Sequence, residues 1–158
     1  MKKISITYKL NGRTVTRDVP TNQILVDLIR DTERLLGTKV SCDQSVCGAC
    51  TVLVNGEPRT ACSTFSFEID NCDLLTIEGL ANGKKLSAVQ DAFLNSSAFQ
   101  CGYCTPGMIM LATSLLEQEA NPDEKVIRRW MGANICRCTG YKMIIEAVQT
   151  VTEKDNDC

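Results

Sequence analysis

QCGYCTPG at residues 100–107 and CRCTG at residues 136–140 are the stretches that decide how this chain is organised. Each contains two cysteines, and a helix-start signal follows each cysteine pair. Threonine caps helix N-termini well, and proline such as Pro106 suits the first helical position. We therefore expect four thiols at the N-terminal ends of helices, where backbone N–H groups and the macrodipole favour negative charge. The pattern predicts a site for an anionic metal–thiolate centre.

The numbers of cysteine and histidine residues limit the kinds of metal site and nucleophile that this chain can form. The 158-residue chain has 10 cysteines and no histidine. It starts without the apolar core of a signal peptide, so we expect a reducing cytoplasm and no disulfide framework. Without histidine, Rieske centres, Cys/His zinc fingers and nucleophiles that depend on histidine are excluded. Ligation by thiolates alone selects zinc, copper(I) or iron–sulfur.

Charge and hydropathy exclude several other classes of partner. The formal net charge is -2, so neither nucleic acid nor an anionic membrane surface is expected as a partner. No apolar run is long enough to cross a bilayer. The sequence also lacks a P-loop and a glycine-rich nucleotide fingerprint. These exclusions favour an electron carrier over a catalyst.

The first half reads as strands around one helix. Alternating apolar residues and the turn Asn11-Gly12 predict a hairpin. Pro20-Thr21 is expected to introduce a helix whose apolar positions over residues 24–36 fit one face and which Gly37 would end. The predicted strands cover residues 4–10, 14–19, 51–54, 59–62 and 74–77.

The cysteines of this half have the spacing C-x4-C-x2-C at Cys42, Cys47 and Cys50, and eleven residues then precede Cys62. This spacing is typical of plant-type 2Fe-2S ligation, in which a loop wraps a small cluster and a fourth thiolate arrives from a neighbouring strand. Cys47 and Cys50 alone would also fit a zinc knuckle or a redox dithiol.

The second half reads as helix, cysteine pair, helix, twice over. We expect helices from Ser87, from Thr105 to about residue 119, from Asn121-Pro122 to Gly132, and after Thr139, with Asn121 and Thr139 as caps. The repeat predicts four helices around a cluster that receives one cysteine pair from each half of the repeat. Cys72 and the terminal Cys158 are left over, and we expect no function for either.

At these motifs the chain closely resembles the iron–sulfur subunits of the molybdenum hydroxylases, the family of xanthine dehydrogenase, aldehyde oxidoreductase, carbon monoxide dehydrogenase and nicotinate dehydrogenase. The resemblance includes the motif Cys47-Gly48-Ala49-Cys50-Thr51-Val52, together with Cys42 and Cys62, and so covers nearly the whole chain. Position 41 departs from the family because many members have glycine where this chain has Ser41. A serine there would be slightly strained if its φ were positive.

The resemblance implies an α+β chain. A β-grasp, plant-type ferredoxin-like domain would occupy residues 1–80, an all-α four-helix domain residues 81–152, and a polar tail residues 153–158. Each domain would hold one 2Fe-2S cluster. The ligands on the FAD side would be Cys42, Cys47, Cys50 and Cys62, and those on the molybdenum side Cys101, Cys104, Cys136 and Cys138.

The resemblance also implies the function and the partners. Electrons would pass from the molybdenum cofactor of a large subunit, through both clusters, to FAD on a medium subunit, with no substrate turnover on this chain alone. Gln100 matches the family position that hydrogen-bonds the molybdopterin, and Cys138 matches the ligand beside the pterin amino group. The assembly would be a cytoplasmic heterotrimer or a dimer of heterotrimers.

Two other functions compete with this one. A free-standing soluble ferredoxin would need only one cluster, so the helical half argues against it. A structural module with two four-cysteine zinc sites would use the same thiols without any redox chemistry. Iron and acid-labile sulfide would distinguish the cluster protein from the zinc module.

Overall fold

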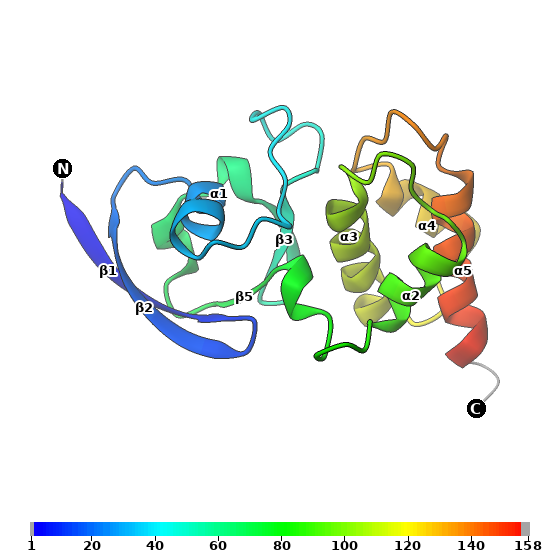
Figure 1. Cartoon of the computed structure of the whole chain (residues 1–158), viewed down its shortest axis with the longest axis horizontal. Coiled ribbons are helices and arrows are strands. Elements are labelled where there is room, and N and C mark those ends of the chain that lie inside the picture. Colours follow the sequence, from blue (N-terminus) through cyan, green and yellow to red (C-terminus); the bar gives the residue numbers. More distant parts are fainter. Residues whose placement is uncertain (1, 156–158) are drawn as a thin grey trace.

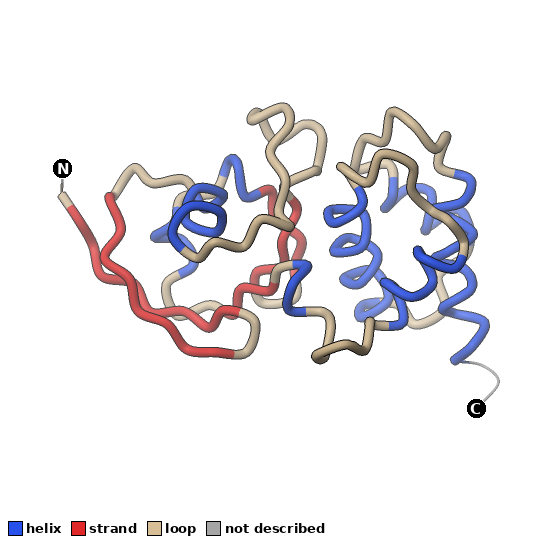
Figure 2. Tube along the Cα trace, in the orientation of Figure 1, coloured by secondary structure: helices blue, strands red, loops and turns tan. Residues whose placement is uncertain are grey.

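The structure is a computed structural model that describes residues 2–155 (Figures 1 and 2). Its N-terminal part is built on a five-stranded mixed sheet in the order β2-β1-β5-β3-β4. β1 pairs in parallel with β5, and the other neighbours are antiparallel. The strands are β1 (Lys3–Leu10), β2 (Arg13–Pro20), β3 (Thr51–Val54), β4 (Glu57–Thr60) and β5 (Asp73–Leu75).

The alternation that predicted the hairpin also determines its buried face. Ile6, Tyr8 and Leu10 of β1 are buried under the helical segments, while the residues between them are exposed. The turn at Asn11 and Gly12 has positive φ at both positions, as a two-residue hairpin turn requires. The predicted hairpin is therefore confirmed.

The helix expected over residues 24–36 is much shorter than predicted. α1 covers only Leu25–Asp27 and continues into a π-helical segment, η1 (Leu28–Thr32). The chain then leaves the helix at Glu33, whose carboxylate accepts hydrogen bonds from the Tyr8 hydroxyl at 2.6 Å and the Arg17 guanidinium at 2.8 Å. These contacts with β1 and β2 override the local apolar periodicity, and burial together with the Glu33 bond raises the pKa of Tyr8.

Two short strands also end earlier than predicted. β4 stops at Thr60, and Ala61–Ser63 form a 3₁₀ turn, η2, that buries Cys62. β5 stops at Leu75, and two further 3₁₀ turns, η3 (Ser66–Ile69) and η4 (Ile77–Gly79), flank this strand in the sequence. Cys72 lies in the loop before β5, as expected, and Cys158 lies outside the described residues.

The C-terminal part contains α2 (Ala88–Asn95), α3 (Thr105–Gln118), α4 (Glu124–Met131) and α5 (Lys142–Asp155). One hydrophobic core takes buried residues from each of these helices, among them Phe93, Met108, Ile127 and Val148. The Ser87–Gln90 capping box at α2 is confirmed, with both reciprocal hydrogen bonds present.

Three predicted helix caps are wrong, and the first is Thr105, because Cys104 is the N-cap residue of α3 and Thr105 is its first helical residue. Asp123, and not Asn121, caps α4, because its carboxylate accepts the Val126 N–H at 2.7 Å. Thr139 does not cap α5, which begins only at Lys142. Its hydroxyl lies 3.0 Å from the Cys136 sulfur instead, so the second cysteine pair is followed by a turn with positive φ at Gly140 and Tyr141. α5 also continues through Asp155, beyond the expected start of a tail at residue 153.

The two parts pack together through α3 and β3, which lie side by side in Figure 1. Gly107 near the start of α3 lies so close to the Gly48 carbonyl that an added Cβ would come within 2.5 Å of it. Further along α3, the Ser114 hydroxyl donates to the Gly56 carbonyl at 2.8 Å. This packing brings the loops before β3, α3 and α5 to one side of the molecule, along the top of Figure 1.

Candidate metal centres

The loop before β3 directs backbone N–H groups at a cysteine sulfur. The amides of Gln44, Val46 and Cys47 donate to the Cys42 sulfur at 3.4, 3.4 and 3.3 Å. These bonds, led by the one from Gln44, lower the pKa of Cys42 to about 6. Hydrogen bonds to a charged form favour that form, so this loop is built around a thiolate.

The same loop contains two residues with left-handed backbone. Asp43 has φ +55° and Ser45 has φ +59°, whereas Ser41 is not among the residues with positive φ. The strain considered at Ser41 is therefore absent there and occurs further into the loop. The Ser45 amide donates to the Cys62 sulfur at 3.4 Å, which connects the loop to the turn after β4.

Cys50 and Cys62 form the inner side of this site. Both are buried, and burial raises the pKa of the Cys50 thiol to about 12. A buried thiol with a raised pKa favours the neutral form, unless a metal takes the place of the proton. Cys42, on the exposed side of the site, therefore favours the thiolate form without a metal. Cys50, on the buried side, favours the thiolate form only with a bound cation.

The second site collects its thiols from two distant loops. Cys101 and Cys138 are exposed and their sulfurs lie 3.7 Å apart, a contact that raises the pKa of Cys138. Cys104 precedes α3, and burial raises its pKa to about 12. Burial also acts to raise the pKa of Cys136, but the Thr139 hydroxyl and amide both donate to its sulfur and leave the pKa lowered.

The eight thiols interact with one another in pairs. Cys101 and Cys138 are in direct sulfur–sulfur contact, and the neighbouring thiols of Cys47, Cys62 and Cys136 shift the pKa values of Cys42, Cys50 and Cys104. Within residues 2–155, no three Cys, Asp or Glu side chains gather round one point as a single metal ion would require. Two pairs of thiols fit the donor set of a two-iron cluster, in which each iron takes two cysteines.

A junction between the two sites was not predicted from the sequence. The Ile135 amide donates to the Cys47 carbonyl at 2.8 Å, so the residue next to Cys136 is hydrogen-bonded to the first cysteine loop. On the other side, the Tyr103 hydroxyl donates to the Val40 carbonyl, two residues before Cys42. Both contacts join residues that are far apart in the sequence, so no local pattern indicates them.

Asn134 fills the centre of this junction. It is 1% exposed, and its side-chain oxygen accepts the Thr51 hydroxyl at 3.3 Å. A Cβ added to Gly48, which has φ +69°, would lie 1.6 Å from that oxygen, and one added to Gly107 would lie 2.9 Å from the side-chain nitrogen. Only glycine leaves room for Asn134 at these two positions. The sequence signal that could have indicated this close approach is the presence of glycines within or next to the cysteine motifs.

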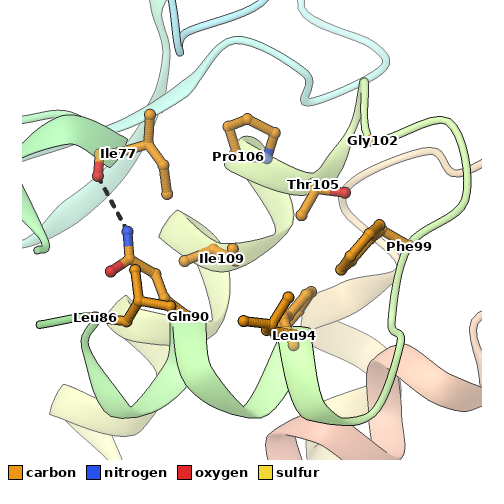
Figure 3. Close-up of a pocket in the computed structure, with 10 residues that line it drawn as sticks. Ile77, Leu86, Gln90, Leu94, Phe99, Gly102, Thr105, Pro106 and Ile109 are labelled. Carbon is orange, nitrogen blue, oxygen red and sulfur yellow. Dashed lines mark hydrogen bonds between the residues drawn. The ribbon is translucent and has the colours of Figure 1, made fainter. Parts of the chain in front are cut away.

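Gln100 is exposed and lies in the loop between α2 and α3, next to the exposed Cys101. An apolar pocket of about 340 Å³ adjoins this loop, between α2 and the start of α3 (Figure 3). Phe99 and Leu94 line it and are 37% and 53% exposed. The second site therefore has an open edge of two thiols and a glutamine beside an apolar surface.

Comparison with known proteins places this arrangement in a family. A 2Fe-2S iron–sulfur cluster binding domain model matches residues 7–101, and a 2Fe-2S binding domain model matches residues 76–149. The sequence is 42% identical over 154 residues to the nicotinate dehydrogenase small FeS subunit of Eubacterium barkeri, and the match covers 98% of both chains. This chain belongs to the iron–sulfur subunits of the molybdenum hydroxylase family.

Other members of this family agree in sequence and fold. The xanthine dehydrogenase iron–sulfur-binding subunit of Escherichia coli O157:H7 is 41% identical over 150 residues, covering 92% of this chain and 92% of that protein. A chain of quinoline 2-oxidoreductase from Pseudomonas putida 86 superposes with a TM-score of 0.93 at 38% identity, covering 99% of this chain and 98% of that one.

The same fold also occurs inside a longer chain. Aldehyde oxidoreductase from Desulfovibrio gigas matches 98% of this chain with a TM-score of 0.93 at 35% identity, but the match covers only 17% of that protein. The ferredoxin-like character of the mixed sheet and helices is thereby confirmed, and the chain is part of an oxidoreductase. None of the helices within residues 2–155 is long and apolar enough to span a membrane.

Proposed function

We propose that this iron–sulfur subunit carries electrons from the molybdopterin cofactor of a large subunit to FAD on a medium subunit. The observation that carries the proposal is that the eight thiols interact in pairs and are grouped in two sites that hydrogen bonds join. Each site would hold one 2Fe-2S cluster, which exchanges single electrons when bound.

The ligands and domains of the proposal follow from the sequence and the packing. Residues 1–80 would form the ferredoxin-like domain and residues 81–152 a four-helix domain that holds the second cluster. The N-terminal ligands are Cys42, Cys47, Cys50 and Cys62, and the C-terminal ligands are Cys101, Cys104, Cys136 and Cys138. Their donor sets fit the group, because N–H and O–H donors already point at the sulfurs of Cys42, Cys62 and Cys136.

The exposed edge of the second site supports contact with the molybdenum subunit. Gln100 would hydrogen-bond the molybdopterin, and Cys138 would lie beside its amino group. Both residues are exposed, as such contacts require. The apolar pocket next to Gln100 is large enough to receive a partner's side chains, and exposed aliphatic and aromatic residues around it are typical of an interface (Figure 3).

The partners would complete a heterotrimer or a dimer of heterotrimers. Several relatives are named as a small subunit, or as subunit beta or gamma of a dehydrogenase. These names support such an assembly. A cytoplasmic location is also proposed, because the cysteine spacing fits cluster ligation and not a disulfide framework.

The test is purification from the native source. We expect this chain to co-elute with molybdenum and flavin, to carry iron and acid-labile sulfide, and to show two distinct paramagnetic signals on partial reduction. A chain that elutes alone, in full yield, would indicate a free carrier. A colourless protein with zinc and no acid-labile sulfide would indicate the structural zinc module.

The docking face can be tested separately with Leu94→Asp. A charge in the apolar pocket should abolish co-elution with the molybdenum subunit while both paramagnetic signals remain. Ile4→Asp is the matched control, because Ile4 is a 43% exposed apolar residue on β1, at the opposite end of the molecule (Figure 1). Equal loss of co-elution in both variants would contradict the assignment of this face.

A further inference from the structure

Ser45 has a backbone conformation that its side chain disfavours. Its φ of +59° lies in the left-handed region, where a residue with a Cβ is strained and glycine is not. Residues held in such conformations persist only where surrounding contacts hold them, and they cluster at functional sites. Ser45 is exposed, so packing does not supply those contacts.

The Ser45 hydroxyl supplies one contact. It shares a 2.6 Å hydrogen bond with the hydroxyl of Thr60, the last residue of β4. Thr60 in turn shares a 2.8 Å bond with the hydroxyl of Ser63. Three hydroxyls in a row thus attach the tip of the cysteine loop to the segment that contains Cys62.

The Ser45 backbone makes a second contact with that same segment. Its amide donates to the Cys62 sulfur at 3.4 Å. The direction of this N–H depends on the left-handed φ, because the backbone torsions at Ser45 set the orientation of its peptide groups. One residue therefore holds Thr60 with its side chain and presents an N–H to the Cys62 sulfur with its backbone.

We propose that Ser45 is a positioning residue that sets the reduction potential of the cluster held by Cys42, Cys47, Cys50 and Cys62. The proposal rests on the proposed function only in requiring a 2Fe-2S cluster at these four cysteines. N–H donors to cluster sulfur stabilise the more negative, reduced state and so raise the potential. The bond between Ser45 and Thr60 keeps the N–H of Ser45 directed at Cys62.

The test is a redox titration of the purified complex, followed by electron paramagnetic resonance. Ser45→Ala keeps the strained Cβ and removes the hydroxyl, so the loop should relax and the midpoint potential of this cluster should fall. Ser45→Gly removes the hydroxyl but also the strain, so the potential should stay near that of the wild type. The signal of the second cluster serves as the internal reference and should not shift in either variant.

Thr60 provides a variant outside the cysteine loop. Thr60→Val removes the hydroxyl at nearly constant shape and should lower the potential as Ser45→Ala does, whereas Thr60→Ser should restore it. Because Thr60 is on β4, this pair remains informative if Ser45→Ala fails to incorporate iron. If Thr60 had only a structural role, the variants would change in thermal stability, but Thr60→Val and Thr60→Ser would have the same midpoint potential.

Two results would overturn the proposal. Unchanged potentials in both Ser45→Ala and Thr60→Val would show that the hydroxyl bond does not position the donor. An equal fall in Ser45→Gly and Ser45→Ala would show that the hydroxyl acts by its dipole and not by holding φ. Either result leaves the proposed function intact, whereas a chain without iron would reject the proposed function before the titration begins.

Discussion

The two cysteine sites have the same number of thiols but are built in opposite ways. The first takes three of its cysteines from one short loop, and that loop supplies N–H donors to the sulfurs of Cys42 and Cys62. The second takes two pairs from loops more than 30 residues apart, and there the Thr139 amide and hydroxyl donate to the Cys136 sulfur of the same loop. Local chain geometry therefore shapes the first site, and helix packing shapes the second.

The two sites also differ in the solvent exposure of their cysteines. Cys50 and Cys62 are buried at the first site, whereas Cys101 and Cys138 are exposed at the second. A site that faces outward can contact another cofactor at close range, but it depends on a partner to exclude water. The comparison teaches that one chain can contain a more buried and a more exposed cysteine site, and that each of them includes at least one buried cysteine.

Removing the metal should have the largest effect. Each half has about 75 residues, a size at which core burial alone gives marginal stability and a cluster acts as a staple. We expect the iron-free chain to lose most of its far-UV and near-UV circular dichroism. Spectra that match those of the iron-loaded chain would show that both halves fold without their clusters.

A cysteine substitution in each site should separate the two centres. Cys101→Ala removes an exposed ligand, so we expect half of the iron and one paramagnetic signal to disappear while the other signal remains. Cys50→Ala removes a 2% exposed ligand between the sheet and its cluster, so we expect loss of the other signal and a lower melting temperature. Cys72→Ala is the control and should keep both signals. Loss of both signals in Cys101→Ala would mean that the sites do not assemble separately.

Asn134→Ala tests the junction between the sites. The substitution removes the longer of two hydrogen bonds of the Thr51 hydroxyl, which also donates to the Gly48 carbonyl at 2.7 Å, and leaves a cavity between Gly48 and Gly107. We expect a loss of about 0.5–3 kcal/mol in the free energy of unfolding, and a weaker spin–spin interaction between the two reduced clusters. The exposed Asn95 on α2 offers the control Asn95→Ala, which should change neither quantity.

Tyr103→Phe should have the smallest effect. It deletes the hydrogen bond from the hydroxyl to the Val40 carbonyl, which lies on the surface between the two cysteine loops. A single hydrogen bond of this kind contributes about 0.5–1.5 kcal/mol to the free energy of unfolding. Chemical denaturation can measure that loss. If the paramagnetic signal of the first cluster changes more than that of the second, the loop at Val40 depends on this hydrogen bond more than the loop at Tyr103 does.

The sequence predicted those parts of the molecule that local rules control. The hairpin at Asn11-Gly12, the capping box at Ser87 and the start of α3 after Cys104 each follow from neighbouring residues, and each is confirmed. The cysteine spacing predicted the thiol sets for the same reason, because a loop around a cluster is a local structure. Their assignment as ligands stays a prediction that the iron analyses above can test.

The predictions are wrong where contacts between residues distant in the sequence determine the structure. The helix over residues 24–36 ends early because Glu33 bonds Tyr8 and Arg17 of another layer, and Thr139 fails as a cap because its hydroxyl donates to the Cys136 sulfur. The junction at Asn134 was missed because its contacts lie more than 80 residues away in the sequence. None of these contacts produces a periodic or spacing signal.

The hydrogen bond from Ile135 to Cys47 has a consequence for biosynthesis. A ribosome completes the first cysteine set at Cys62 and must add roughly 70 further residues before Ile135 exists, which takes on the order of 4–15 s. During that interval the Cys47 carbonyl lacks its final partner and Asn134 has not yet packed against Gly48. The first cysteine set is therefore complete before the junction that joins it to the second site can form.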